Sequence, residues 1–549
     1  MTTAELRLER LRKELSGGST VRLVNGNEVH VDAAIEEIPG LCQRVRDACR
    51  GRLAMIVCSD ERGRGGSFVL RYVLDVEGVD LFAVLVARVD PAVGSSAPTF
   101  ASVAHLFPTA TRYEREVKDM FGLVAVGNPD LRPMVLHDDW PDGAYPLRKD
   151  FDIGTKPARA EGRRFEFIEV GGEGVSEIPV GPVHAGIIEP GHFRFSVLGE
   201  SVINLEARLY YTHRGVEKLA EGMTLDQALL LSERISGDEA VANSTAYCQA
   251  LERVAGVEAP ERARQTRAVC AEMERIHNHL GTLAGLSIDA GFAYGGARLR
   301  ILKERMMRLN EEVAGSRLLF GVNRIGGTRV DIGQTSALVS QTVRSVLADS
   351  QRVIQALRNE SSVMDRFSGT GAISPGVAAE LGLLGVTARS SGLDVDTRRD
   401  HPYGAYAGLR VDKHHDTKRQ ATEFGVELAK ARGDVLARFD ARVEEVENSA
   451  DVILQVIGGL HEAGPLSVPV TREMLTPFGH ALGYAESHRG RTLHWVMVGE
   501  DGDSLFRYKV RTASFANWPA IEVAVLNDIL ADFPLVNKSL DLSYAGNDL

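Results

Sequence analysis

The strongest constraint in this sequence is a set of long apolar patterns with helical spacing in its second half. In one pattern, apolar residues recur every three or four positions over about six turns: Val435, Phe439, Val443, Val446, Ala450, Ile453 and Ile457. A second pattern has the same spacing: Val269, Met273, Ile276, Leu280 and Leu283. Because 3.6 residues make one turn, each set forms one face of a helix. We therefore predict two core helices and a mainly helical fold in this part of the chain.

The first 150 residues carry strand signals as well as helix signals. Phe68, Leu70, Tyr72 and Leu74 alternate with period two, and residues 81–86 form a short apolar run typical of a buried strand. Residues 152–178 are polar and rich in glycine, which indicates a linker. Strand-like patterns return at 492–498 and 505–510. We predict an α+β domain at 1–151, a linker at 152–178, and a mainly α-helical domain with small β elements at its two ends at 179–549.

The composition excludes several classes of function. Among 549 residues there are 63 Lys or Arg and 75 Asp or Glu, and the formal net charge of −12 gives no attraction for nucleic acid. The N-terminal segment MTTAELRLERLRKEL lacks the apolar core of a signal peptide, and no run approaches the roughly 18 apolar residues that span a bilayer. The five cysteines include no C-x-x-C pair, and we find no P-loop and no G-x-G-x-x-G after a strand. We expect a cytoplasmic protein that reaches a membrane only through partner subunits.

Several motifs resemble the C-type and D-type subunits of bacterial NADH-quinone oxidoreductase (complex I). Residues 113–122, 128–132 and 146–150 resemble the signature of the C-type subunit. The rest of the chain, from Gly181 onward, resembles the D-type subunit and, more closely, the large subunit of formate-hydrogenlyase-type (group 4) membrane NiFe hydrogenases, in which the same fusion occurs. Four stretches carry this second resemblance: residues 211–218, 272–279, 399–406 and 514–519.

The resemblance implies a core subunit of a membrane-associated oxidoreductase complex. Its partners would be an iron–sulfur small subunit similar to the B-type subunit of complex I, and ferredoxin-like and antiporter-like membrane subunits. The iron–sulfur cluster would belong to the small subunit, and NADH oxidation, if the complex performs it, to another subunit. We expect no cofactor within this chain, although a quinone could bind beside it.

The sequence departs from the hydrogenases at the nickel ligands. Those enzymes hold nickel with two cysteines in an R-x-C-G-x-C segment and two in a D-P-C-x-x-C segment, because a thiolate cage suits a redox-active metal pair. The matching positions here carry Ser236, Glu239, Ser543 and Gly546. The chain also ends without the extension that is cleaved in the hydrogenases. We therefore expect no metal in this chain and no hydrogen chemistry at a nickel–iron centre.

The D-type subunit of complex I also lacks these cysteines and binds a quinone headgroup in the vacated cavity, using a tyrosine and a histidine. Alignment places Gly237 at the tyrosine position, so this donor is missing. The Gly/Pro-rich loop 181–192 retains His184 and His192, which could donate protons or could be turn residues only. We assign both to a quinone- or proton-active cavity, together with His401 and Asp541.

The segment around Glu239 has a structural and a functional interpretation. Ser236 and Glu239 precede a helical run and match an S-x-x-E capping box, which would require no chemistry. Alternatively, Asp238 and Glu239 carry protons in the vacated cavity, where desolvation raises a carboxyl pKa. Glu217 matches a glutamate that passes protons in the hydrogenases, or it pairs with Arg214 one helical turn away.

Other residues are assigned by their place in the family motifs. Arg214 and His279 match positions beside the partner's iron–sulfur cluster, or they are an exposed helix arginine and a helix-capping histidine. Asp400 and His401 precede Pro402, which favours an ordered loop over a helix, and we place both in the cavity wall. The polar tail closes the cavity or is merely solvated: Asn537, Lys538, Asp541 and Asp548.

These observations predict an electron-transfer subunit without a nickel–iron centre, in which Glu217, Asp238, Glu239 and Asp400 are the catalytic candidates. The alternative is a catalytically inactive scaffold that couples redox subunits to an ion-translocating membrane module. A working NiFe hydrogenase is a third hypothesis, against which the four replaced cysteines argue.

Overall fold

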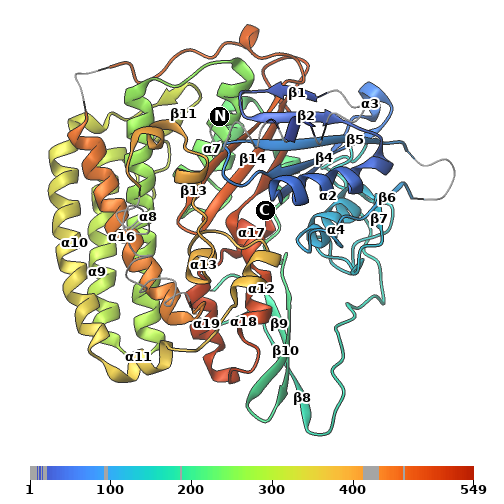
Figure 1. Cartoon of the computed structure of the whole chain (residues 1–549). Helices are drawn as coiled ribbons and strands as arrows, with labels where there is room; N and C mark the ends of the chain where they lie inside the picture. The colour runs from blue at the N-terminus through green and yellow to red at the C-terminus, as the bar shows by residue number, and fades with distance from the viewer. Residues whose placement is uncertain are drawn as a thin grey trace.

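The structure is a computed structural model that describes residues 9, 11–13, 15, 21–91, 97–185, 188–411, 432–460 and 464–549. Most of the N-terminal segment that we compared with a signal peptide lies outside these residues. Among the described helices, none is long and apolar enough to cross a bilayer. In Figure 1, a red C-terminal segment lies between the blue N-terminal domain and a layer of long helices.

The N-terminal domain is built on a five-stranded sheet of order β1-β2-β5-β4-β3, in which only β2 and β5 are parallel. Its elements are β1 (Val21–Val24), β2 (Glu28–Asp32), α2 (Ile38–Cys49), β3 (Arg52–Asp60), α3 (Arg62–Gly65), β4 (Phe68–Asp75), β5 (Phe82–Val89), β6 (Thr99–Ala101), α4 (Ala110–Phe121) and β7 (Val124–Val126). β4 and β5 confirm the two predicted strands. Nearly all of their residues are buried, because α2 and α4 pack against this sheet and the C-terminal domain docks beside them.

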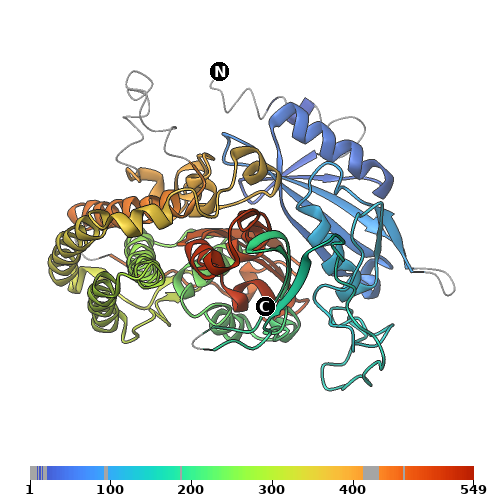
Figure 2. The same ribbon diagram turned by 90° about the horizontal axis from the view of Figure 1, so that it is seen from below.

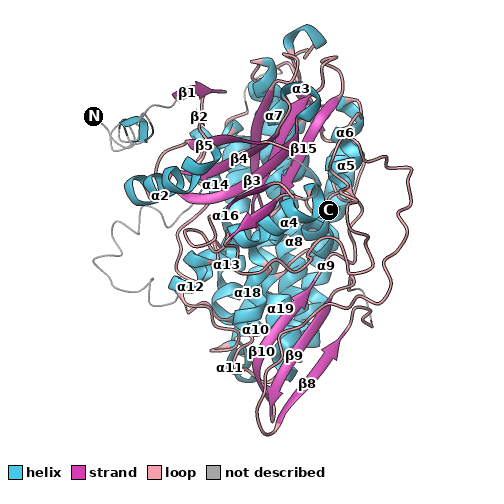
Figure 3. Ribbon diagram, turned by 90° about the vertical axis from the view of Figure 1, so that its right-hand side faces the viewer, coloured by secondary structure: helices cyan, strands magenta, loops and turns pink. Residues whose placement is uncertain are grey.

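The expected linker is shorter than predicted. Residues 152–174 form no helix or strand, but β8 (Val175–Val180) begins inside the predicted linker range 152–178. It pairs with β9 (His192–Leu198), which pairs with β10 (Ser201–Arg208), so β8 is an edge strand and tolerates Pro179. Figures 1 and 3 show this small sheet projecting from the body of the molecule.

The helical layer confirms both predicted core helices. They are α8 (Glu261–Asp289) and α16 (Val435–Gly458), which pack against each other and bury their periodic apolar residues except Ile457. The other helices of this domain are α5 (Val216–Ala220), α6 (Leu225–Ser232), α7 (Ala240–Ala255), α9 (Ala293–Ala314), α10 (Ser336–Arg358), α11 (Ser361–Phe367), α12 (Pro375–Glu380), α13 (Gly385–Ser390) and α14 (Thr397–Asp400). A two-stranded sheet joins β11 (Asn323–Arg324) to β12 (Gly327–Thr328).

The C-terminal segment connects the two domains. Its antiparallel sheet contains β13 (His480–Ser487), β14 (Gly490–Val498) and β15 (Leu505–Arg511), and it confirms the strands predicted at 492–498 and 505–510. α17 (Ala513–Asn517), α18 (Pro519–Ala524), α19 (Phe533–Leu540) and α20 (Tyr544–Asp548) follow. Arg507 and Arg511 of β15 donate to the carbonyl oxygens of Cys58 and Ala54 in β3, at 3.0 and 3.1 Å. The two domains therefore share a bonded interface, which Figure 2 shows from below.

Candidate functional site

The four positions that the motif comparison matched to nickel ligands come together in space, and we call them the ligand-position cluster: Ser236, Glu239, Ser543 and Gly546. The hydroxyl oxygens of Ser236 and Ser543 are 3.1 Å apart. The amide of Gly546 donates to Ser543 Oγ at 2.9 Å, and a Cβ on Gly546 would lie 3.7 Å from Glu239 Oε2. The cluster thus joins the segment before α7 to the last helix of the chain.

Arg214 holds these two segments in place. Its guanidinium donates to the carbonyl oxygens of Arg234 and Ile235, both at 2.8 Å, and of Ala545 at 3.2 Å. The predicted pairing of Arg214 with Glu217 is wrong. Glu217 turns the other way and bonds to Arg507 at 2.8 Å and Lys509 at 3.0 Å. These two cations, which outweigh the opposing effect of burial, lower the pKa of Glu217.

The turn between β13 and β14 completes the site, and the sequence interpretation missed it. Ser487 donates to Glu239 Oε1 at 2.5 Å. Arg489 donates to Asp238 Oδ2 at 2.7 Å and lies 3.4 Å from Glu239 Oε2 without a hydrogen bond. Ser-His-Arg at a tight turn would ordinarily be solvated, but the side chains of Ser487, His488 and Arg489 are buried. Polar residues at a turn between two buried strands were the signal that could have indicated this role.

Two neighbouring carboxyl groups in the site have opposite shifts in pKa. Burial raises the pKa of Glu239, and the nearby carboxylates of Asp238 and Asp541 raise it further. Burial also opposes ionisation of Asp238, but the Arg489 guanidinium and the Ser236 hydroxyl hold the pKa of Asp238 well below its usual range. The site therefore contains a carboxyl group with a raised pKa, Glu239, although Arg489 opposes this shift, beside the Asp238–Arg489 ion pair.

The predicted capping box is wrong. α7 begins at Ala240, and the side chains of Ser236 and Glu239 accept no hydrogen bond from the amides of its first turn, although the Glu239 carbonyl accepts from the Asn243 amide at 3.0 Å. Instead, Glu274 of α8 accepts from the amides of Val241 and Ala242 at 2.8 and 3.2 Å. The neighbouring helix α8 thus caps α7. The Ser236 hydroxyl and the Glu239 carboxyl group are therefore free to face the site.

His279 and Asp541 both lie near His488. His279 is fully buried within α8, where its Nε2 bonds to Glu445 Oε2 at 2.8 Å, so it is not a helix cap and offers no surface to a partner's cluster. Its ring lies 6.0 Å from that of His488, whose Nε2 is 3.6 Å from Asp541 Oδ2. Asp541 thus lies beside the turn that contains Ser487, His488 and Arg489.

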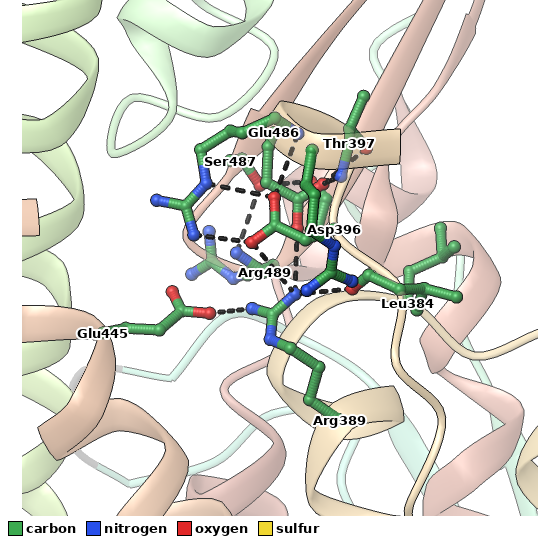
Figure 4. A network of polar contacts seen from close by, with 12 residues as sticks. Leu384, Arg389, Asp396, Thr397, Glu445, Glu486, Ser487 and Arg489 are labelled. Atoms are coloured by element: carbon green, nitrogen blue, oxygen red, sulfur yellow. Dashed lines mark hydrogen bonds and ion pairs between the residues drawn. The ribbon is translucent and has the colours of Figure 1, made fainter. Parts of the chain in front are cut away.

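A buried network of charges extends from this site toward the N-terminal domain (Figure 4). Arg389 forms ion pairs with Glu445 and, at 3.3 Å, with Glu486. Glu486 accepts from the Thr397 hydroxyl at 2.6 Å, and Asp396 lies 3.8 Å from Arg389. The network therefore connects α16, β13 and α14.

His184 and His192 close the loop before β9. His184 Nε2 bonds to the Gly191 carbonyl at 2.7 Å and His192 Nδ1 to the Gly181 carbonyl at 3.2 Å, while His192 Nε2 is buried without a partner among the described residues. Residues 186 and 187 of this loop lie outside the described part of the chain. Glu189 accepts from the Ala545 amide at 2.9 Å, so the loop rests on the helix that contributes Gly546.

Asp400 and His401 do not belong to this site. Asp400 ends the one-turn helix α14, against the expected loop, because its carboxylate accepts from the Asp396 amide at 2.8 Å. His401 bonds to Asp75 at 2.7 Å and Asp80 at 3.0 Å of the N-terminal domain. Its side chain is an interdomain contact and not part of the cavity wall around Glu239.

The tail residues have separate structural roles. Asp548 accepts from the amide and hydroxyl of Thr212 at 3.0 and 2.6 Å. Lys538 packs over Gly285 of α8, where an added Cβ would lie 2.9 Å from its side chain. The tail is therefore folded against the body and is not a solvated end.

Comparison with known proteins gives relatives over nearly the whole chain. The family described as respiratory-chain NADH dehydrogenase, 30 Kd subunit, matches residues 31–157, and the 49 Kd subunit family matches residues 298–477 and 467–548. Formate hydrogenlyase subunit 5 of Escherichia coli is 36% identical over 534 residues, which cover 95% of this chain and 89% of that protein. The C/D subunit of NADH-quinone oxidoreductase from Phocaeicola vulgatus is 30% identical and covers 81% and 86%, respectively.

A solved structure extends the comparison. A chain of the membrane-bound sulfane sulfur reductase, an archaeal respiratory membrane complex, superposes with a TM-score of 0.62 at 26% identity, covering 69% of this chain and 99% of that chain. The relatives thus include subunits of NADH-quinone oxidoreductase, of hydrogenases and of a sulfane sulfur reductase. The chain belongs to the family of fused 30 kDa and 49 kDa subunits that complex I shares with formate-hydrogenlyase-type membrane hydrogenases.

Proposed function

We propose that this chain is a core electron-transfer subunit of a membrane-bound oxidoreductase complex, with a proton-active site at the ligand-position cluster. The observation that carries the proposal is Glu239. It matches a cysteine position of the hydrogenases by motif, is buried with a raised pKa, and lies beside the Asp238–Arg489 ion pair. A buried carboxyl group whose pKa is raised is suited to deliver a proton near neutral pH.

The donor set does not fit a nickel–iron pair. The four positions supply two hydroxyl groups, one carboxyl group and a glycine, none of which replaces a soft thiolate ligand. Among the described residues, no group of three or more His, Cys, Asp or Glu is arranged to hold a metal ion. We therefore assign no step to a metal in this chain.

The chemistry of the site follows from its charges. Glu239 in its neutral form donates a proton to an acceptor at the cluster, and the resulting carboxylate faces the Arg489 guanidinium, 3.4 Å away. Ser487 keeps the carboxyl group oriented through its hydrogen bond to Oε1. Arg489 also remains bonded to Asp238, so it compensates the new charge without rearrangement.

The electron would come from an iron–sulfur small subunit docked beside the cluster, on the cytoplasmic face of a membrane. Apolar side chains near the site support such a docking surface. In the loop that rests on α20, Val183 is 85% exposed and Ile188 is 50% exposed, and Tyr211 nearby is 37% exposed. Ferredoxin-like and antiporter-like membrane subunits would complete the complex.

A quinone is the candidate acceptor of the electrons and protons that is tested next. The observation that supports quinone binding is His192, whose buried Nε2 lacks a partner among the described residues. Gly237 supplies no side-chain donor at the tyrosine position of complex I. Inhibitor-sensitive quinone reduction by the purified complex would establish this acceptor, and its absence would direct the search to another one.

Glu239→Gln tests the proposal because it keeps the size of the side chain and removes the proton. The complex would be purified through an N-terminal tag, since Leu549 is buried against the amides of Arg214 and Gly215. We expect turnover to fall by roughly 10²-fold or more, the contribution typical of a general acid, with the same subunits co-purifying. Glu500→Gln, at an exposed position, is the control.

The scaffold hypothesis predicts a different result. If the site only couples subunits by conformation, Glu239→Gln would retain wild-type turnover and proton movement as long as the complex assembles. Such a result would refute the proton-active site.

A further inference from the structure

A large cavity lies between the two domains, apart from the ligand-position cluster. Its volume is about 530 Å³, within the range of small-molecule sites. Side chains of α4 and β3 form one wall, and β10, α17, α18 and the segment 381–385 form the other. None of the four cluster residues lines this interdomain cavity, so it is a separate feature of the molecule.

Two arginines in its lining have no acidic partner. Arg511 is 2% exposed and donates only to the carbonyl oxygens of Ala54 and Arg491, at 3.1 and 2.7 Å. Arg112 donates to the Phe515 carbonyl and, at 2.8 Å, to Asn547 Oδ1. Within the described ranges, neither guanidinium has a carboxylate within 4.0 Å, whereas the neighbouring Arg491 is paired with Asp75. A buried charge without a counter-charge is costly, so its retention points to an anion that compensates it.

The two arginines have Tyr113 as a common neighbour. Arg112 stacks over the Phe515 ring at 4.3 Å, and Tyr113 packs against the same ring at 4.9 Å. The Tyr113 hydroxyl donates to the Ala54 carbonyl, which also accepts from Arg511. Arg112 and Arg511, both of which line the cavity, therefore both lie near the Tyr113 side chain.

Two further groups of the lining bear on a polar anchor. Tyr210 lines the cavity, its hydroxyl is buried without a partner among the described residues, and its backbone φ of 69° is strained for a non-glycine residue. Burial raises the pKa of Glu522 to about 7, so this lining carboxyl group neutralises the arginines only in part. Burial also lowers the pKa of Arg511 to about 10, at which it is still charged near neutral pH.

The other six carboxyl groups of the lining are each paired with an arginine other than Arg112 and Arg511: Asp75, Asp130, Glu206, Asp396, Asp400 and Glu486. Much of the remaining lining is apolar, including Leu384, Trp518 and Leu526. We propose that the interdomain cavity binds a small amphiphilic anion, with a carboxylate or phosphate head group at Arg112, Arg511 and the Tyr210 hydroxyl, and an apolar body against Phe515, Trp518 and Leu384. The bound molecule would contact both domains and stabilise their association.

Calorimetric titration of the full-length protein with octanoate tests this site. We expect one octanoate per chain, no comparable binding of 1-octanol, which lacks the charge, and none of inorganic phosphate, which lacks the apolar body. Arg511→Gln should weaken octanoate binding by about tenfold or more, as expected for a lost charged hydrogen bond. The exposed Arg298→Gln is the matched control, and Arg112→Gln serves if the Arg511 variant does not fold.

Each contrary result overturns a defined part of the proposal. Equal binding of octanol would overturn the anionic anchor, and equal binding of phosphate would overturn the apolar half. Unchanged octanoate affinity in both arginine variants would overturn the site. Glu239→Gln should leave octanoate binding intact, so the failure of one proposal is distinguishable from the failure of the other.

Discussion

His401→Gln probes the contact that fastens the N-terminal domain to α14. The imidazole is 2% exposed, stacks on Phe82 at 4.7 Å, and presents Nε2 to Asp75 at 2.7 Å and Nδ1 to Asp80 at 3.0 Å. A neutral imidazole has only one N–H, so both hydrogen bonds to carboxylates require the imidazolium form. Glutamine can replace one of these bonds but not the charge.

The magnitude follows from the environment of the two carboxylates. Burial disfavours the charged ring, but Asp75 and Asp80 outweigh it and raise the pKa of His401, although Arg491 beside Asp75 opposes them. Tyr484 and Asn27 also bond to Asp80. Asp80 is 43% exposed and contributes little after solvent screening, whereas Asp75 is 20% exposed. The one charge-assisted hydrogen bond to Asp75 then stabilises the folded protein by about 2 kcal/mol.

The sign of the pH dependence is fixed by the raised pKa. The stabilisation is complete below the unfolded pKa of about 6.5 and is lost as the pH rises through the higher folded pKa. At pH 6, His401→Gln should therefore lower the free energy of unfolding by about 2 kcal/mol, and at pH 9 by clearly less. Denaturant unfolding at both pH values measures this, with the exposed His105→Gln as control. An equal loss at the two pH values would refute the imidazolium contact.

Three further predictions concern the surroundings of the site. Glu274→Ala should destabilise the protein by about 1–3 kcal/mol, because two amides of α7 lose their acceptor. Glu274→Gln should destabilise it less. Equal melting temperatures of the wild type and Glu274→Ala would refute the role of Glu274 as a cap. Glu217→Gln should lower the free energy of unfolding by about 3–5 kcal/mol, because Arg507 and Lys509 lose a buried partner. A Glu217→Gln variant with normal stability but no turnover would instead assign Glu217 to proton transfer. Elemental analysis of the purified complex should find no stoichiometric nickel in this chain, and one nickel per chain would contradict the replacement of its ligands.

Local sequence signals failed where distant contacts decide the outcome. The S-x-x-E pattern at Ser236 predicted a cap, but Glu274 occupies that role from another helix. His401 was assigned to the cavity from its motif, but its two carboxylate partners lie more than 300 positions earlier in the chain. Neither partner is visible in the local pattern, because the pattern contains no information on which elements pack together.

The long helices, several strands and the family could all be predicted before the fold was known, because periodicity and motif identity are properties of neighbouring residues. Other features emerge only from the folded chain: Ser487 and Arg489 complete the site, the pKa of Glu239 is raised and that of Asp238 lowered, and two arginines without acidic partners among the described residues line a cavity between the domains. The pKa of a carboxyl group and the compensation of a charge depend on burial and on groups brought close in space. Both arise only when distant parts of the chain pack together.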